Sequence, residues 1–216
     1  MNPATLNARI FGGLGRAAAI LGTGYQLYRP ANPLAPLGGP ALGSITAAFD
    51  QSASFAFSTP QSYAAPLHYG LFDPTICAVG DYLVGTGGTY FIAAIEAFKP
   101  ALCVKAERVL SFTRAAAPVL AGLTGYSGRT AGTEETVLAG WPASVLLGGR
   151  SETIDEAGRV ADADRAPGWE IRLPALVGVP IVTADHATDD LGRGYAILGA
   201  ELTDHGWRLS AVQTVA

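Results

Sequence analysis

The chain has few charged side chains and no long apolar run. Only 15% of its 216 residues are Asp, Glu, Lys or Arg, against 49% hydrophobic residues, and the net charge is −4. This balance argues against a dedicated nucleic-acid-binding protein, which would carry a basic face. Because a monomer in solution needs a charged surface, so little charge indicates that part of the surface contacts other subunits.

Targeting segments and cysteine chemistry are also scarce. No stretch approaches the roughly 18 uninterrupted apolar residues of a membrane helix, and the N-terminus lacks the basic and apolar regions of a signal peptide. We therefore expect a soluble protein made in the cytoplasm. The only cysteines are Cys77 and Cys103, too few for a disulfide framework and without further Cys or His at ligand spacing. We expect free thiols and neither a metal nor a cofactor.

Turn-forming residues are abundant, with 27 Gly and 14 Pro. Such a composition favours many short strands, and therefore a mainly β fold. One exception is a helix predicted over residues 2–21, with Asn2 as its cap and Pro3 in the first turn. Its apolar residues follow helical spacing and form one stripe: Leu6, Ile10, Leu14, Ala17, Ala18 and Leu21.

Two interpretations of this helix remain open, because helical stability comes from packing but not from a particular partner. The helix packs either on its own β module or on a neighbouring subunit. A proline-rich segment over 30–43 follows it, and we expect an extended, projecting arm there. The candidate subunit-interface residues are Leu6, Ile10 and Leu14 in the helix, and Pro33, Leu34 and Pro36 in the arm.

An internal repeat is the most informative pattern in the chain. When Tyr90 is aligned with Tyr195, Ile92 falls on Ile197, and an aspartate lies upstream in each copy, at 81 and 185. Internal repeats define architecture more reliably than local propensity. The sequence therefore predicts two tandem small β-barrel or β-sandwich modules with an N-terminal helix.

The expected organisation is a helix over 1–24, a first β module over 25–114, a linker over 115–134 and a second β module over 135–216. Residues 51–62 and 148–167 lack a clear apolar period, and we expect projecting loops in both.

No recognisable catalytic motif is complete. Gly125–Gly128 resembles a nucleophile elbow, but Arg129 stands where the motif needs glycine. Asp185–His186 with Asp189–Asp190 does not match a calcium loop, and aspartates of this kind are common in hairpin turns. Glu96 and Glu201 are equivalent in the repeat but belong to different modules. We therefore predict a protein that is not an enzyme.

The repeated segment resembles the closing part of head-closure (stopper, or head–tail joining) proteins of tailed bacteriophages. In the first module Gly80-Asp81-Tyr82-Leu83 and Tyr90-Phe91-Ile92 carry the resemblance. In the second module it rests on Trp141-Pro142-Ala143, Ile171-Arg172-Leu173-Pro174, Asp185 and Tyr195-Ala196-Ile197. The duplication departs from the single barrel usual in that family.

The resemblance implies a non-enzymatic virion protein, a ring subunit of the neck or head–tail connector. Its partners would be further copies of itself, six or twelve in a ring, portal, adaptor or tail proteins, and packaged DNA in the lumen, without a membrane. Alternatives are a tail, baseplate or capsid-decoration protein and, in another class, a small β-barrel ligand-binding protein or enzyme.

Overall fold

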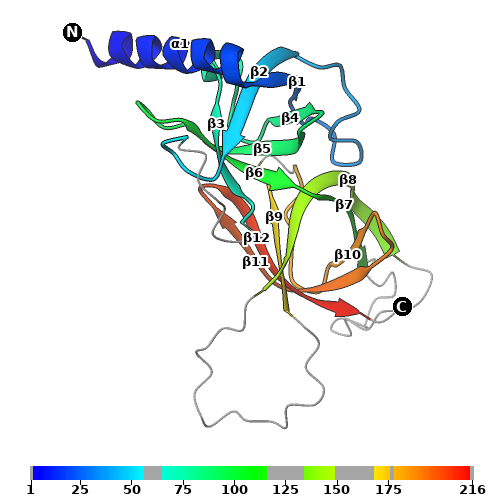
Figure 1. The fold of residues 1–216 in the computed structure, drawn as a ribbon. Coiled ribbons are helices and arrows are strands. Elements are labelled where there is room, and N and C mark those ends of the chain that lie inside the picture. Colours follow the sequence, from blue (N-terminus) through cyan, green and yellow to red (C-terminus); the bar gives the residue numbers. More distant parts are fainter. Residues whose placement is uncertain (1, 56–64, 116–133, 149–167, 176–177, 215–216) are drawn as a thin grey trace, which may run out of the picture.

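The computed structural model of the chain is mainly β, with one N-terminal helix and two closed six-stranded barrels in tandem (Figure 1). It describes residues 2–55, 65–115, 134–148, 168–175 and 178–214. The predicted fold class is therefore confirmed. Among these residues, no helix has the length and apolar character needed to cross a membrane.

The first barrel has the strand order β1-β2-β3-β6-β5-β4 and closes by pairing β1 with β4. Its strands are β1 (Thr23–Tyr28), β2 (Gly43–Asp50), β3 (Leu67–Leu71), β4 (Tyr82–Gly85), β5 (Gly88–Ala94) and β6 (Ala101–Ala106). A short 3₁₀ helix, η1 (Pro74–Ile76), connects β3 to β4.

The second barrel has the order β7-β8-β9-β12-β11-β10 and closes by pairing β7 with β10. Its strands are β7 (Arg108–Ala115), β8 (Glu134–Leu147), β9 (Gly168–Leu173), β10 (His186–Asp189), β11 (Gly194–Thr203) and β12 (Gly206–Thr214). Every strand is antiparallel to its neighbours, as in the first barrel.

The two barrels have the same topology, which confirms the predicted duplication. Strand order is the same when β1–β6 are matched with β7–β12. Tyr90 and Tyr195 lie in the equivalent strands β5 and β11, and in both strands the register shifts directly after the aligned isoleucine, Ile92 or Ile197.

The boundary between the modules differs from the prediction. We expected the first module to extend to residue 114, but β7 (Arg108–Ala115) pairs with β8 and β10 in the second barrel. The boundary therefore falls at Glu107. The sequence misled because β6 leads into β7 without a glycine or proline. Of the predicted linker, residues 116–133 lie outside the described residues.

The proline-rich segment after β1 does not project, contrary to expectation. The carbonyl oxygen of Pro33 accepts hydrogen bonds from Trp141 Nε1 at 2.6 Å and from the backbone N–H of Ala139 at 3.1 Å. Both donors belong to β8 in the second barrel. The segment is thus a strap that joins the barrels. Of the two predicted projecting loops, residues 56–62 and 149–167 lie outside the described residues.

One buried carboxylate closes each barrel in the same way. Arg29 Nε and Nη2 donate to the two oxygens of Asp81, both at 2.7 Å. Arg114 makes the matching pair with Asp185, at 2.7 and 2.9 Å. The backbone N–H three residues upstream of each aspartate also donates to its carboxylate. Because each arginine lies at the end of the first strand and each aspartate precedes the fourth, the pair ties together the strands whose pairing closes the barrel.

A hydrophobic cluster joins the two barrels, beside a separate core inside the first barrel. Tyr82, Phe91 and Val104 of the first barrel are buried in the same cluster as the core of the second barrel. The Tyr82 hydroxyl donates to the carbonyl oxygen of Pro142 at 2.6 Å, and its ring packs 6.4 Å from that of Trp141. These contacts make the barrels one packed unit.

Helix α1 (Pro3–Leu21) confirms the predicted helix, and it lies over β2 and β3 at the far end of the first barrel (Figure 1). The side chain of Asn2 accepts a hydrogen bond from the Ala4 N–H at 3.1 Å, as predicted for its cap. The helix ends at Gly22, where a Cβ would lie 2.6 Å from the Ala47 carbonyl group. Glycine is therefore required where the chain turns from α1 into β1.

We predict that Asp81→Ala and Asp185→Ala each destabilise the whole protein by about 3 kcal/mol, because each removes a bidentate ion pair to a buried carboxylate and the acceptor of a backbone N–H. Since a hydrophobic cluster joins the barrels, each variant should lower a single cooperative transition. Chemical denaturation followed by both tryptophan fluorescence and circular dichroism measures this, because all three tryptophans lie in the second barrel and circular dichroism reports on both barrels. The exposed Asp204→Ala is the control and should change the free energy of unfolding by less than about 0.5 kcal/mol. Two separate transitions would contradict unfolding of the two barrels as one unit.

Candidate subunit interface

The helix α1 is fastened to the first barrel along a narrow line. Ala18 is its only fully buried residue, and at Gly15 an added Cβ would come within 3.0 Å of the Asp73 Cβ. Near the N-terminal end, Asn7 Oδ1 accepts a hydrogen bond from the Phe98 N–H at 2.9 Å. A 19-residue helix with so little burial has most of its surface left over for another contact.

The remaining surface carries an apolar seam. Leu6, Ile10, Gly13, Ala17 and Ile20 are spaced alternately by four and three residues, which places them on one flank of the helix. Leu6 is 41% exposed and Ile20 is 84% exposed, while the three residues between them are half-buried. A Cβ added at Gly13 would meet nothing within 4 Å. We call these five residues the α1 seam.

The structure divides the predicted helix stripe between two faces. Ala18 is held by the barrel, and Leu14, one turn earlier on the same face, is half-buried. Leu6 and Ile10 belong to the α1 seam. The prediction missed Ile20, the most exposed apolar side chain of the helix, although its spacing of fourteen from Leu6 was visible in the sequence.

The three predicted interface residues of the arm differ in how exposed they are to solvent. Pro36 is buried, and Pro33 holds the strap against the second barrel through its carbonyl group. Leu34 is 54% exposed. Of these three residues, only Leu34 contributes apolar side-chain surface to which another molecule has ready access.

The aspartates that suggested a cation site are occupied by donors from the protein. Asp185 is paired with Arg114. Asp189 accepts from Arg193 Nε at 2.8 Å and from the Tyr195 hydroxyl at 3.1 Å. Asp190 points elsewhere and accepts from the Val109 N–H at 3.3 Å. The three carboxylates do not converge, and no cluster of potential metal ligands is found among the described residues.

The two thiols are free, and their surroundings make them poor nucleophiles. Burial raises the pKa of Cys77 to about 12, and the fully buried Cys103 has a pKa raised still further by the same cause. Since the thiolate is the reactive form, neither cysteine is activated at neutral pH.

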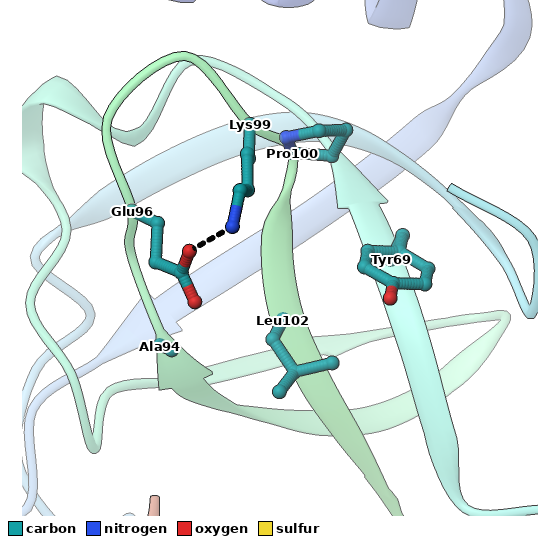
Figure 2. Close-up of a pocket in the computed structure, with 6 residues that line it drawn as sticks. All are labelled: Tyr69, Ala94, Glu96, Lys99, Pro100 and Leu102. Atoms are coloured by element: carbon teal, nitrogen blue, oxygen red, sulfur yellow. Dashed lines mark hydrogen bonds and ion pairs between the residues drawn. The ribbon is translucent and has the colours of Figure 1, made fainter. Parts of the chain in front are cut away.

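A shallow pocket of about 100 Å³ lies beside the hairpin that joins β5 and β6 (Figure 2). It is lined by Tyr69, Ala94, Glu96, Lys99, Pro100 and Leu102. Glu96 and Lys99 form an exposed ion pair across its mouth, and the hydrogen bond from Lys99 lowers the pKa of Glu96. Small-molecule sites usually enclose roughly 300 Å³ or more, so this pocket is too small for such a site. Glu201 lies in β11, in register with Arg208 and apart from this hairpin pair.

The chain matches no protein-family model, and neither a curated protein nor a solved structure gives a significant match.

The environment of Asp189 makes a pH-dependent contribution to stability. Burial by itself would raise its pKa, but hydrogen bonds from Arg193, Tyr195 and the Leu191 N–H outweigh burial and lower the pKa below the ordinary value of 3.8. A carboxyl group with a lowered pKa in the folded state stabilises the protein above its ordinary pKa. That contribution disappears as the pH falls through the folded-state value.

We therefore predict that Asp189→Asn lowers the free energy of unfolding by about 1.5–3 kcal/mol at pH 7. The difference from wild type should shrink steadily below pH 3.8. Urea denaturation at several pH values measures it, with the exposed neighbour Asp190→Asn as control. A difference that stays constant down to the acid limit would show that the charge of Asp189 does not contribute.

Proposed function

We propose that this chain is a non-enzymatic structural protein of a tailed-phage virion, a ring subunit of the neck or head–tail connector. The observation that carries the proposal is the α1 seam, an apolar stripe that is exposed at Leu6 and Ile20 on a helix with a single fully buried residue. An exposed stripe of this kind marks a surface that another protein covers.

Charge favours a neighbouring copy as the partner and a contact between unlike surfaces. Helix α1 contains Arg9 and Arg16 and no acidic residue, so two α1 helices packed together would bring four positive charges close. Residues 108–216 contain nine basic and thirteen acidic residues, whereas residues 1–107 contain five of each. The basic helix is thus suited to the acidic second half of another copy. A contact between two different surfaces closes into a ring when its rotation returns to the start.

The phage assignment rests on the resemblance of the repeated segment, and the supporting features of the chain are its β-barrel fold and its sparse charge. A tail, baseplate or capsid-decoration protein would use the same features and remains the alternative within this class. The other class, a small β-barrel ligand-binding protein or enzyme, needs converging polar groups in a pocket. The pocket of about 100 Å³ beside Glu96 and Lys99 offers little support for it.

We predict that Ile20→Asp abolishes ring formation while leaving the barrels folded. The side chain is 84% exposed, so the substitution removes no core contact but places a charge in the α1 seam. Light scattering gives the mass of the assembly, circular dichroism checks the fold, and electron microscopy shows whether a ring forms and is found in particles.

Ala19→Asp is the matched control, because Ala19 is exposed and adjacent but lies off the seam. It should keep the wild-type mass. A wild-type chain that stays monomeric at high concentration and is absent from purified particles would overturn the proposal.

A further inference from the structure

The chain enters the two barrels at equivalent points. Gly22 lies seven residues before Arg29, and Glu107 lies seven residues before Arg114. At the first entry a Cβ on Gly22 would touch the Ala47 carbonyl group, and at the second the Glu107 N–H donates to the Ala143 carbonyl oxygen at 3.0 Å. Whatever precedes each entry therefore lies over the same end of the barrel. Helix α1 covers this end of the first barrel, and the first barrel covers the same end of the second (Figure 1).

The covered end of the second barrel is a surface that accepts a barrel. We call Trp141–Ala143 of β8 its seat, and all three residues are buried. The Tyr82 hydroxyl donates to the Pro142 carbonyl oxygen, and Phe91 packs into the same core cluster.

The same seat exists in the first barrel. Trp141 is in register with Leu110 of β7, and Ile45 is in register with Tyr25 of β1, so the equivalent seat is Ile45–Ala47. Helix α1 lies over it, and the cover is less complete: Thr46 is exposed, whereas Pro142 at the matching position is buried.

The face that docks on a seat is also present twice. In the first barrel it is the outer face of β5 and β6, where Phe91 and Val104 are paired and at most 2% exposed. The equivalent face of the second barrel pairs Ala196 with Val212 and carries Leu198, which is 60% exposed. Each chain thus has a docking face available at one end and a capped seat at the other.

We propose that the Ile45–Ala47 seat is a docking site for the second barrel of another copy of this chain, and that α1 is the cap that keeps it closed. The contact would repeat between copies the joint that already holds the two barrels of one copy together. It uses a surface of the chain different from the α1 seam and is therefore separate from the ring contact proposed above.

Tethering explains why α1 holds the seat in the free chain. The helix is joined to β1 through Gly22 alone, so it competes at an effective concentration that is millimolar for short tethers. The docking face of the second barrel is also the weaker one, because Ala196 stands where the first barrel has Phe91. A second copy can take the seat only when α1 leaves it, as when the helix is drawn onto another partner.

The test uses the full chain carrying Ile20→Asp, so that loss of the ring contact cannot affect the result. Ala18→Arg is added to release α1, because Ala18 is fully buried and a guanidinium group cannot be accommodated there. The adjacent, exposed Ala19→Arg is the matched control. Sedimentation velocity over a range of concentrations gives the mass, and amide exchange over residues 3–21 reports whether α1 has left the barrel.

We predict that Ala18→Arg at least doubles the average mass at high concentration and that the mass keeps rising, because a seat and a different docking face join copies without limit. Ala19→Arg should keep the mass of its parent. Adding Leu198→Glu to the Ala18→Arg chain should return the mass to that of the parent, which distinguishes docking from nonspecific association.

A released helix with an unchanged mass would overturn the proposal, as would association that Leu198→Glu does not reduce. Gly15→Gln offers a second route to release, because its Cβ would lie 3.0 Å from that of Asp73. If neither variant speeds amide exchange in α1, the helix is held too firmly to be a cap, and the proposal fails.

Discussion

Closure of each barrel depends on a carboxylate that is removed from water. The strands that must pair to close the sheet, β1 with β4 and β7 with β10, are far apart in the chain, and loop closure between them costs conformational entropy. Asp81 and Asp185 offset part of that cost, because each ties an arginine at the end of the first strand to the turn before the fourth. The arginine side chains remain 43% and 33% exposed, so their charge is not fully desolvated. The pair thus avoids much of the penalty of a buried ion pair.

The repeat could be recognised in the sequence because the residues that identify it occupy positions with the same backbone geometry in both copies. Asp81 and Asp185 each precede a strand, and the residue before each has a positive φ, Gly80 in one copy and Ala184 in the other. The sequence could not show the boundary at Glu107. Strand β7 is as apolar as β6 and differs from it only in the strands with which it forms hydrogen bonds, β8 and β10. Nor could the sequence show that Pro33 contacts Trp141, since the strap is held by a backbone carbonyl group, which is common to every residue.

The candidate interface was predictable in kind and less so in detail. Helical spacing identified an apolar stripe, but a helix with glycines at 12, 13 and 15 gives no sign of which flank meets the barrel. The side taken by the barrel is decided by close approach at Gly15 and Ala18, leaving Leu6 and Ile20 outward. The sequence therefore predicted the helix and missed Ile20, the most exposed apolar side chain on it.

Duplication followed by divergence explains why the two barrels are not interchangeable. The arginine–aspartate pair and the strand register are the same in both copies, because a change in either would weaken closure of a barrel. The outer faces were free to change: Tyr82 and Phe91 anchor the first barrel on the second, whereas His186 and Ala196 stand at the equivalent positions of the second barrel. An equally strong face at both ends would join copies without limit. In the docking proposed above, the weaker face and the helix over the remaining seat together keep copies of the chain from joining without limit.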